Sequence, residues 1–96
     1  MEVKAVRTEH IKEMEHCIGL DYKNPRKGKY KAYRNYCAYN TYNWICDHLV
    51  NCGYMKLHIE HEPTMIPSIQ YIYSLTRDGM DFLGGIIGAQ ITERNN

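Results

Sequence analysis

The chain has 96 residues, the size of one small domain, and its formal net charge at neutral pH is only +1. This near-neutral balance favours no class of partner, and no apolar run approaches the roughly 20 residues that a membrane-spanning helix needs. The N-terminal segment is too polar for an export signal, so we expect a cytoplasmic protein that does not interact with membranes.

The first predicted helix begins at Thr8, a suitable N-cap, with Glu9 in the first turn, where negative charge complements the helix dipole. Ile11, Met14 and Ile18 follow at the spacing of one apolar stripe. The stripe predicts that one face of this helix is buried.

Positive charge is concentrated in the segment that follows. Residues 21–36 carry a net charge of +5, and the rest of the chain sums to −4. Turn residues within the segment predict an exposed basic loop over 21–30. Such a loop suits the phosphates of a nucleic acid, although it could also serve only to keep the protein soluble. Six basic side chains make up the charge: Lys23, Arg26, Lys27, Lys29, Lys31 and Arg34.

Two further helices are predicted before the middle of the chain. One covers Lys31–Tyr39, although its tyrosines do not share one stripe. The next covers Thr41–Cys52 and ends at Gly53, a residue that favours the left-handed backbone found just after helices. Its apolar face is predicted to contain either Trp44 or Ile45, followed by Leu49 and Cys52.

A β-hairpin is predicted over residues 54–75, because apolar and polar residues alternate in two runs. Met55, Leu57 and Ile59 lie on one side of the first run, and Ile69–Leu75 alternates in the same way. The connection His61–Ser68 contains two prolines and is too long for a tight turn. It would form the tip of the hairpin.

Thr76 is the predicted N-cap of a last helix over 77–90, with Asp78 in its first turn. Three glycines in its second half each cost about 1 kcal/mol relative to Ala, which indicates a weak end or close approach to another helix. Ile91–Asn96 is predicted to be a polar tail.

The second half of the chain resembles the winged-helix regulators of the MarR and PadR type. Their recognition helix ends in a Leu-x-x-x-Gly-Leu pattern, which Leu49 and Gly53 match, with Tyr54 in place of the last Leu. The strand after their wing closes on Tyr-x-Leu-Thr-x-x-Gly, and this chain has Tyr73, Leu75, Thr76 and Gly79 at those positions. Thr76 would cap the following helix, and Gly79 would allow close packing in its first turn.

The resemblance implies an α+β fold, a winged helix-turn-helix of about four helices with a two- to three-stranded β-wing. Residues 1–96 would form a single domain, and Val3–Val6 would supply the third strand. The first half, with Tyr33-Arg34-Asn35-Tyr36 after a basic loop, is similar to small uncharacterised proteins of phages and prophages.

The leading hypothesis for function is a non-enzymatic, phage-like regulator that binds duplex DNA. By resemblance, Thr41, Tyr42 and Asn43 would enter the major groove, while the six basic side chains contact phosphates. A homodimer through the first helix and the C-terminal helix would suit a palindromic site.

The alternative hypothesis is a winged-helix frame that binds a protein, such as a phage inhibitor of a host defence or transcription factor. The predicted recognition helix contains no Arg and exposes Asp47, and Met65 and Ile66 at the hairpin tip could dock on a protein.

Neither catalysis nor metal binding is predicted. His58 and His61 differ in strand parity and should face apart, and the four cysteines show no CxxC spacing. His16 and Cys17 are adjacent in a predicted helix, where neighbouring side chains point in different directions. We therefore predict no catalytic residue, no metal and no cofactor.

Overall fold

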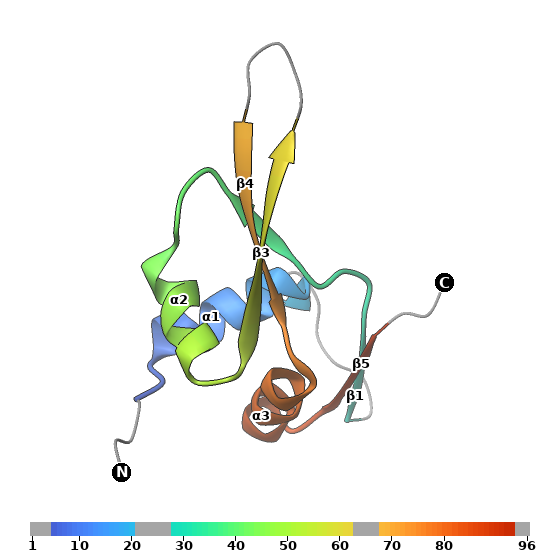
Figure 1. Cartoon of the computed structure of the whole chain (residues 1–96). Helices are drawn as coiled ribbons and strands as arrows, with labels where there is room; N and C mark the ends of the chain where they lie inside the picture. Colours follow the sequence, from blue (N-terminus) through green and yellow to red (C-terminus); the bar gives the residue numbers. More distant parts are fainter. Residues whose placement is uncertain (1–4, 21–27, 63–67, 94–96) are drawn as a thin grey trace.

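The computed structural model describes residues 5–20, 28–62 and 68–93, and it has a mixed α+β fold (Figure 1). Three helices and two small sheets are found in these ranges, and none of the three helices is long and apolar enough to cross a membrane. The elements in chain order are α1 (Thr8–Cys17), β1 (Lys29–Ala32), β2 (Cys37–Tyr39), α2 (Trp44–Asn51), β3 (Met55–Glu62), β4 (Ser68–Leu75), α3 (Arg77–Ile87) and β5 (Gln90–Glu93).

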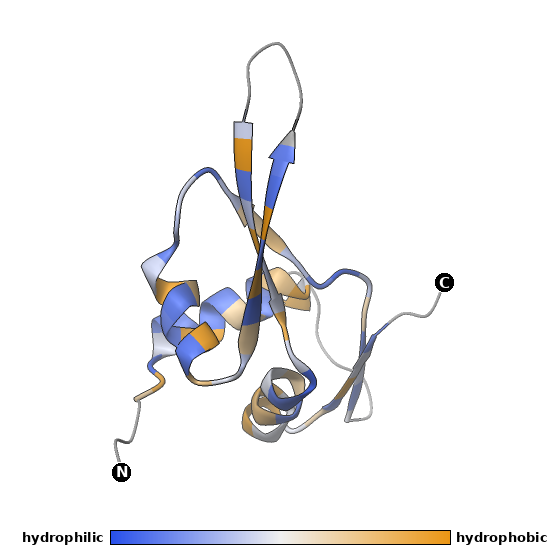
Figure 2. Ribbon diagram, in the orientation of Figure 1, coloured by the Kyte–Doolittle hydropathy of each residue, from blue (hydrophilic) through white to orange (hydrophobic). Residues whose placement is uncertain are grey.

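The hairpin β3–β4 is the longest β-element and confirms the prediction from alternation. Its register pairs Met55 with Leu75 and Leu57 with Tyr73. Met55, Tyr73 and Leu75 are buried, so this side of the hairpin faces the core. Figure 2 shows apolar residues interspersed with polar ones along both strands. The hairpin residues 63–67, which include Met65 and Ile66, lie outside the described residues.

The third strand of this sheet is β2, which pairs antiparallel with β4 and gives the order β2-β4-β3. Of the predicted strand Val3–Val6, only residues 5 and 6 are described, and they are not in a strand. Asn35 helps to hold the chain beside β4, because its side chain bonds both the N–H and the C=O of Leu75 at 2.8 and 3.0 Å.

The predicted helix over Lys31–Tyr39 is wrong, because this segment contains parts of two strands, β1 and β2. In β1 exposed and buried residues alternate, with Tyr30 and Ala32 facing the core. The Tyr30 hydroxyl donates to the C=O of Ile18 at 2.9 Å. Residues 29 and 30 therefore belong to a strand and not to the predicted basic loop.

The partner of β1 is β5, which pairs with it in parallel. The polar tail predicted over Ile91–Asn96 is thus wrong for residues 91–93. Ile91 is 1% exposed and anchors the strand in the core. Parallel strands need a long connection, and this pair joins segments far apart in sequence, so local patterns did not indicate it.

Helices α1 and α2 lie close to their predicted positions but differ at the ends. α1 includes Thr8, and Arg7 is its N-cap. α2 is shorter than predicted, because the Asn43 side chain accepts a hydrogen bond from the N–H of Cys46 and so caps the helix at that point. Gly53 has the expected positive φ of 84°.

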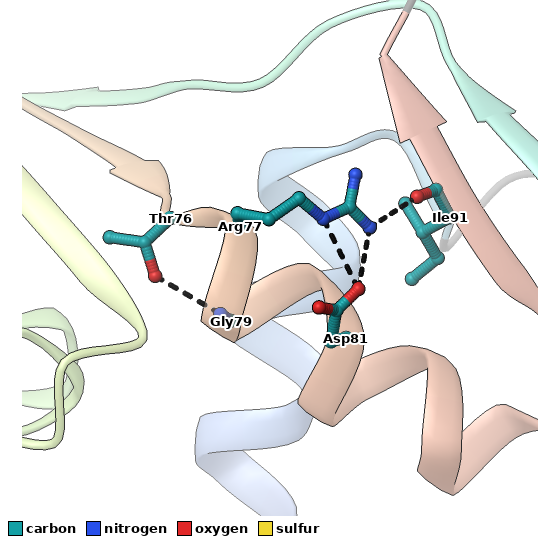
Figure 3. Close-up of polar contacts among 5 residues, drawn as sticks. All are labelled: Thr76, Arg77, Gly79, Asp81 and Ile91. Carbon is teal, nitrogen blue, oxygen red and sulfur yellow. Dashed lines mark hydrogen bonds and ion pairs between the residues drawn. The ribbon is translucent and has the colours of Figure 1, made fainter.

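The start of α3 is built as predicted, with Thr76 as the N-cap (Figure 3). The Thr76 hydroxyl accepts from the N–H of Gly79 at 3.0 Å and donates to the C=O of Gly53 at 2.7 Å. Arg77 bridges Asp81 and the C=O of Ile91, at 2.8 and 2.6 Å from one guanidinium nitrogen. The helix ends at Ile87, before the predicted residue 90, because Gly88 adopts a left-handed φ of 73°.

Two glycines of α3 provide a matched test of packing. A Cβ on Gly79 would lie 2.0 Å from the C=O oxygen of Tyr54, whereas a Cβ on Gly85 would meet nothing within 4 Å. We expect Gly79→Ala to lower the free energy of unfolding by about 2 to 3 kcal/mol, because backbone must move. Gly85→Ala should raise it by up to about 1 kcal/mol, through helix propensity.

Urea denaturation followed by circular dichroism measures both changes. Equal effects of the two substitutions would contradict the close approach of α3 to Tyr54.

Candidate functional site

The predicted phosphate-binding residues are only partly brought together. Lys23, Arg26 and Lys27 lie outside the described residues. Lys29 and Lys31 are exposed on the same face of β1. Arg34 turns back to α1, where one guanidinium nitrogen donates to the C=O of His16 at 2.7 Å. This contact places a cation at the C-terminal end of a helix, where it stabilises the fold.

The predicted groove-reading residues lie before α2 and not within it. Thr41 is exposed in the loop between β2 and α2. Tyr42 is 56% exposed, and its ring lies 4.5 Å from that of Tyr71. The Asn43 side-chain oxygen is occupied as the α2 cap. Asn43 therefore has a structural role, and only Thr41 and Tyr42 present free faces to a partner.

These two groups of residues lie on opposite sides of the molecule. In Figure 1 the loop that leads into α2 is at the upper left, while β1 lies at the lower right beside β5. A single duplex contact that uses Lys29, Lys31 and Tyr42 together would have to span the whole domain.

The most exposed large apolar side chain in the described part of the chain is Trp44, at 74%. It is the first residue of α2, two positions after the exposed Tyr42. The buried face of α2 is formed instead by Cys46 and Leu49. Of the two predicted alternatives for the apolar face, Trp44 is therefore wrong, and Ile45 is half-buried. We call Tyr42, Trp44 and the hollow that Trp44 lines between α1 and α2 the Trp44 surface.

The start of α2 is tied to the sheet by one buried tyrosine. The Tyr73 hydroxyl donates to Asp47 at 2.6 Å and accepts from the backbone N–H of Asn43 at 3.1 Å. Burial and the bond to Asp47 raise the pKa of Tyr73 to about 12. The hydroxyl therefore stays protonated near neutral pH, and it positions the residues on either side of Trp44.

The hollow of the Trp44 surface has a volume of about 540 Å³ and lies between α1, α2 and the residues before α1. Two imidazole rings, His10 and His48, meet in its wall with their centroids 4.5 Å apart. Its charged groups are Arg7, Glu9 and Asp47, so the two carboxylates outnumber the one guanidinium. The lining residues are Ala5, Arg7, Glu9, His10, Trp44, Asp47, His48 and Asn51.

His10 is held neutral by its surroundings. It is 6% exposed, and its Nδ1 accepts a hydrogen bond from the N–H of Arg7 at 2.9 Å. Burial and the neighbouring His48 lower the pKa of His10 below its usual range. A neutral ring with an unprotonated Nδ1 therefore completes the first turn of α1.

One group of potential metal ligands occurs in the described residues. Ligand atoms of Glu13, Cys17 and Cys37 lie within 4.8 Å of one another. The Glu13 carboxylate accepts a hydrogen bond from the Tyr39 hydroxyl. A hydrogen bond to Cys37 and burial raise the pKa of Cys17, which keeps its thiol protonated and packed. The structure supplies no reason to assign a metal here, and the absence of a metal stays a prediction.

The sequence contained a signal for Trp44 but none for the hollow. Trp44 is five positions from Leu49, which is not the spacing of one helical stripe, whereas Ile45 is at the correct spacing. His10 and His48 come from different helices, so only the packing of α1 against α2 brings them together.

The lowered pKa of His10 predicts how stability depends on pH. In the unfolded chain His10 binds a proton near pH 6.5, whereas in the folded chain it binds the proton only at lower pH. The contribution of neutral His10 to the free energy of unfolding is therefore complete above pH 6.5. It is lost as the pH falls from 6.5 through the lower pKa of His10 in the folded chain. We expect His10→Gln to reduce this loss, because a Gln at this position can still accept from the Arg7 N–H.

Urea midpoints measured from pH 5 to pH 7.5 for both proteins test this expectation. Equal pH dependence in the two proteins would show that His10 is not held neutral.

No family model, curated protein or solved structure matches this chain. The likeness to winged-helix regulators thus rests on the residues of the second half alone. Function has to be argued from the geometry of the exposed surfaces.

Proposed function

We propose that this chain is a non-enzymatic winged-helix-like module that binds a partner protein through the Trp44 surface. The observation that carries this proposal is the 74% exposure of Trp44 at the start of a well-anchored helix. Exposed tryptophan on a rigid element is typical of the residues that dominate binding energy at protein interfaces. Tyr42, two residues before it, is a second aromatic side chain with high exposure, 56%.

The order of elements supports the winged-helix frame. A helix precedes β2, another lies between β2 and the hairpin, and a third follows β4. In the strand order β2-β4-β3 the hairpin lies at one side of the sheet, and its strand β3 packs against α2, which is compatible with a wing. Between β2 and β3 the described chain has one helix where a helix-turn-helix needs two, and residues 40–43 form a loop in that place. This difference weakens the case for DNA reading by the usual pair of helices.

The charges of α2 also favour protein over DNA. The helix contains no Lys or Arg, and Asp47 in its first turn would repel a phosphate. Asp47 and Glu9 in the hollow would instead attract a basic side chain, and the Trp44 ring can contact such a cation through its face. The preferred partner is thus a protein segment that combines an apolar anchor with a Lys or Arg.

Trp44→Ala is the direct test of the proposal. We expect at least about a 30-fold loss of affinity for the partner protein, which is typical of an interface tryptophan. The free energy of unfolding should change by less than about 0.5 kcal/mol, because the side chain is exposed. Ile86→Ala, which alters an apolar residue 52% exposed on α3, should leave affinity unchanged.

Proteins retained from a lysate of the source cells by wild type and Ile86→Ala, but not by Trp44→Ala, identify the partner. Titration of that purified protein, followed by the emission of Trp44, the one tryptophan of the chain, then gives the affinity. Retention of the same proteins by all three baits would contradict the proposal.

A second candidate function is binding of nucleic acid through β1 and β5. It is favoured by the outward orientation of Lys29 and Lys31 beside the exposed neutral side chains of Gln90 and Thr92. Both lysines lie on one face, so one strand of backbone phosphates could contact them together.

Fluorescence anisotropy with duplex DNA at low and moderate salt tests this second function. Lys29→Glu with Lys31→Glu should weaken binding and lower the slope of log affinity against log salt by about 2. Lys12→Glu, on the exposed side of α1, is the control. Absence of binding by wild type at low salt would remove this function.

A further inference from the structure

The outer edge of β3 carries a pattern that is complementary to itself. We propose that the protein forms a homodimer in which β3 pairs antiparallel with β3 of a second copy, with Lys56 opposite Glu60 of the partner. The inference does not depend on the proposed function, because it uses the sheet edge and not the Trp44 surface.

The edge is long and regular. β3 has eight residues, and its register with β4 is unbroken from Met55–Leu75 to Glu62–Ser68. In the described part of the chain, no strand pairs with its other side. The strand contains no Pro and no bulge, which are common ways of preventing edge-to-edge pairing. Its backbone groups are therefore available to a further strand.

Charge specifies the register of this pairing. A two-fold axis through the two His58 residues places Lys56 opposite Glu60 on the exposed face of the sheet, and it does so twice. On the other face the same register places Leu57 opposite Ile59, of which Ile59 is 39% exposed. At the centre of the pairing both faces are thus matched, apolar with apolar and cation with anion.

Neighbouring symmetric registers lose one of these matches. An axis through Leu57 would place Lys56 opposite His58, and no charges would be paired. An axis through Ile59 would bring Lys56 opposite Glu62, but it would also place Leu57 opposite the polar His61. The register centred on His58 is therefore the one that pairs both Lys56 with Glu60 and Leu57 with Ile59, with Met55 opposite His61 at the ends of the paired segment.

In the described sheet of one chain, neither charge lies directly opposite a group of opposite charge. Lys56 lies opposite Ser74, and Glu60 lies opposite Gln70. Lys56 and Glu60 are themselves four residues apart in one strand, a separation of about 13 Å. A measured interaction between these two side chains must therefore come from a second copy.

Charge reversal tests the proposal. Sedimentation equilibrium from low to high micromolar concentration should show a concentration-dependent dimer for wild type. Lys56→Glu or Glu60→Lys alone should raise the dimer dissociation constant by about tenfold, because each creates two like-charged contacts. The double variant Lys56→Glu with Glu60→Lys should restore it to within about twofold, because both pairs form again with reversed sign.

Two controls separate this effect from charge or folding. Lys31→Glu changes net charge as Lys56→Glu does, on an exposed position of β1, and should leave the dimer intact. Trp44→Ala should do the same. Circular dichroism should be unchanged in every variant, since all the substituted residues are exposed. A monomer at all concentrations, single variants without effect, or a double variant that is not restored would each overturn the proposal.

Discussion

The structure depends on the junction at which the hairpin ends and α3 begins. Thr76 serves three contacts there: its N–H donates to the C=O of Tyr54 at 3.0 Å, and its hydroxyl joins Gly53 to Gly79. Gly79 lets the helix approach Tyr54 more closely than any side chain would allow. A short domain has a small core, so a junction that fixes a helix, a hairpin and the turn between them restricts most of the remaining packing.

Tyr73 fixes the position of α2 relative to the sheet. It is fully buried in β4, yet its hydroxyl reaches both Asp47 and the backbone of Asn43. A buried hydroxyl that is satisfied on both sides strengthens specificity, because any shift of α2 would leave a polar group unpaired. Trp44 is consequently held on a fixed helix end although it makes little contact with the core. Rigid presentation of an exposed aromatic side chain reduces the entropy lost on binding.

Separate surfaces therefore carry separate properties in this domain. Lys29 and Lys31 give β1 a basic face, the start of α2 has exposed aromatic rings beside acidic groups, and the outer edge of β3 alternates in charge. A DNA reader would place its cations and its recognition helix on one side, whereas β1, which carries Lys29 and Lys31, lies away from α2 in Figure 1. A module that binds a protein can use the Trp44 surface alone, and pairing at β3 would present two such surfaces in one assembly.

Local sequence determined the elements whose signals are short-range. The alternation in 54–75, the Thr76 cap and Gly79 all predicted the hairpin and α3, because strand parity, helix capping and close packing depend on nearby residues. Only the tertiary structure decided that Lys31–Tyr39 contains strands, since β1 is stabilised by β5 from the other end of the chain. It likewise turned Arg34 inward and brought His10 to His48. These outcomes depend on contacts between residues distant in sequence, and local periodicity carries no information about them.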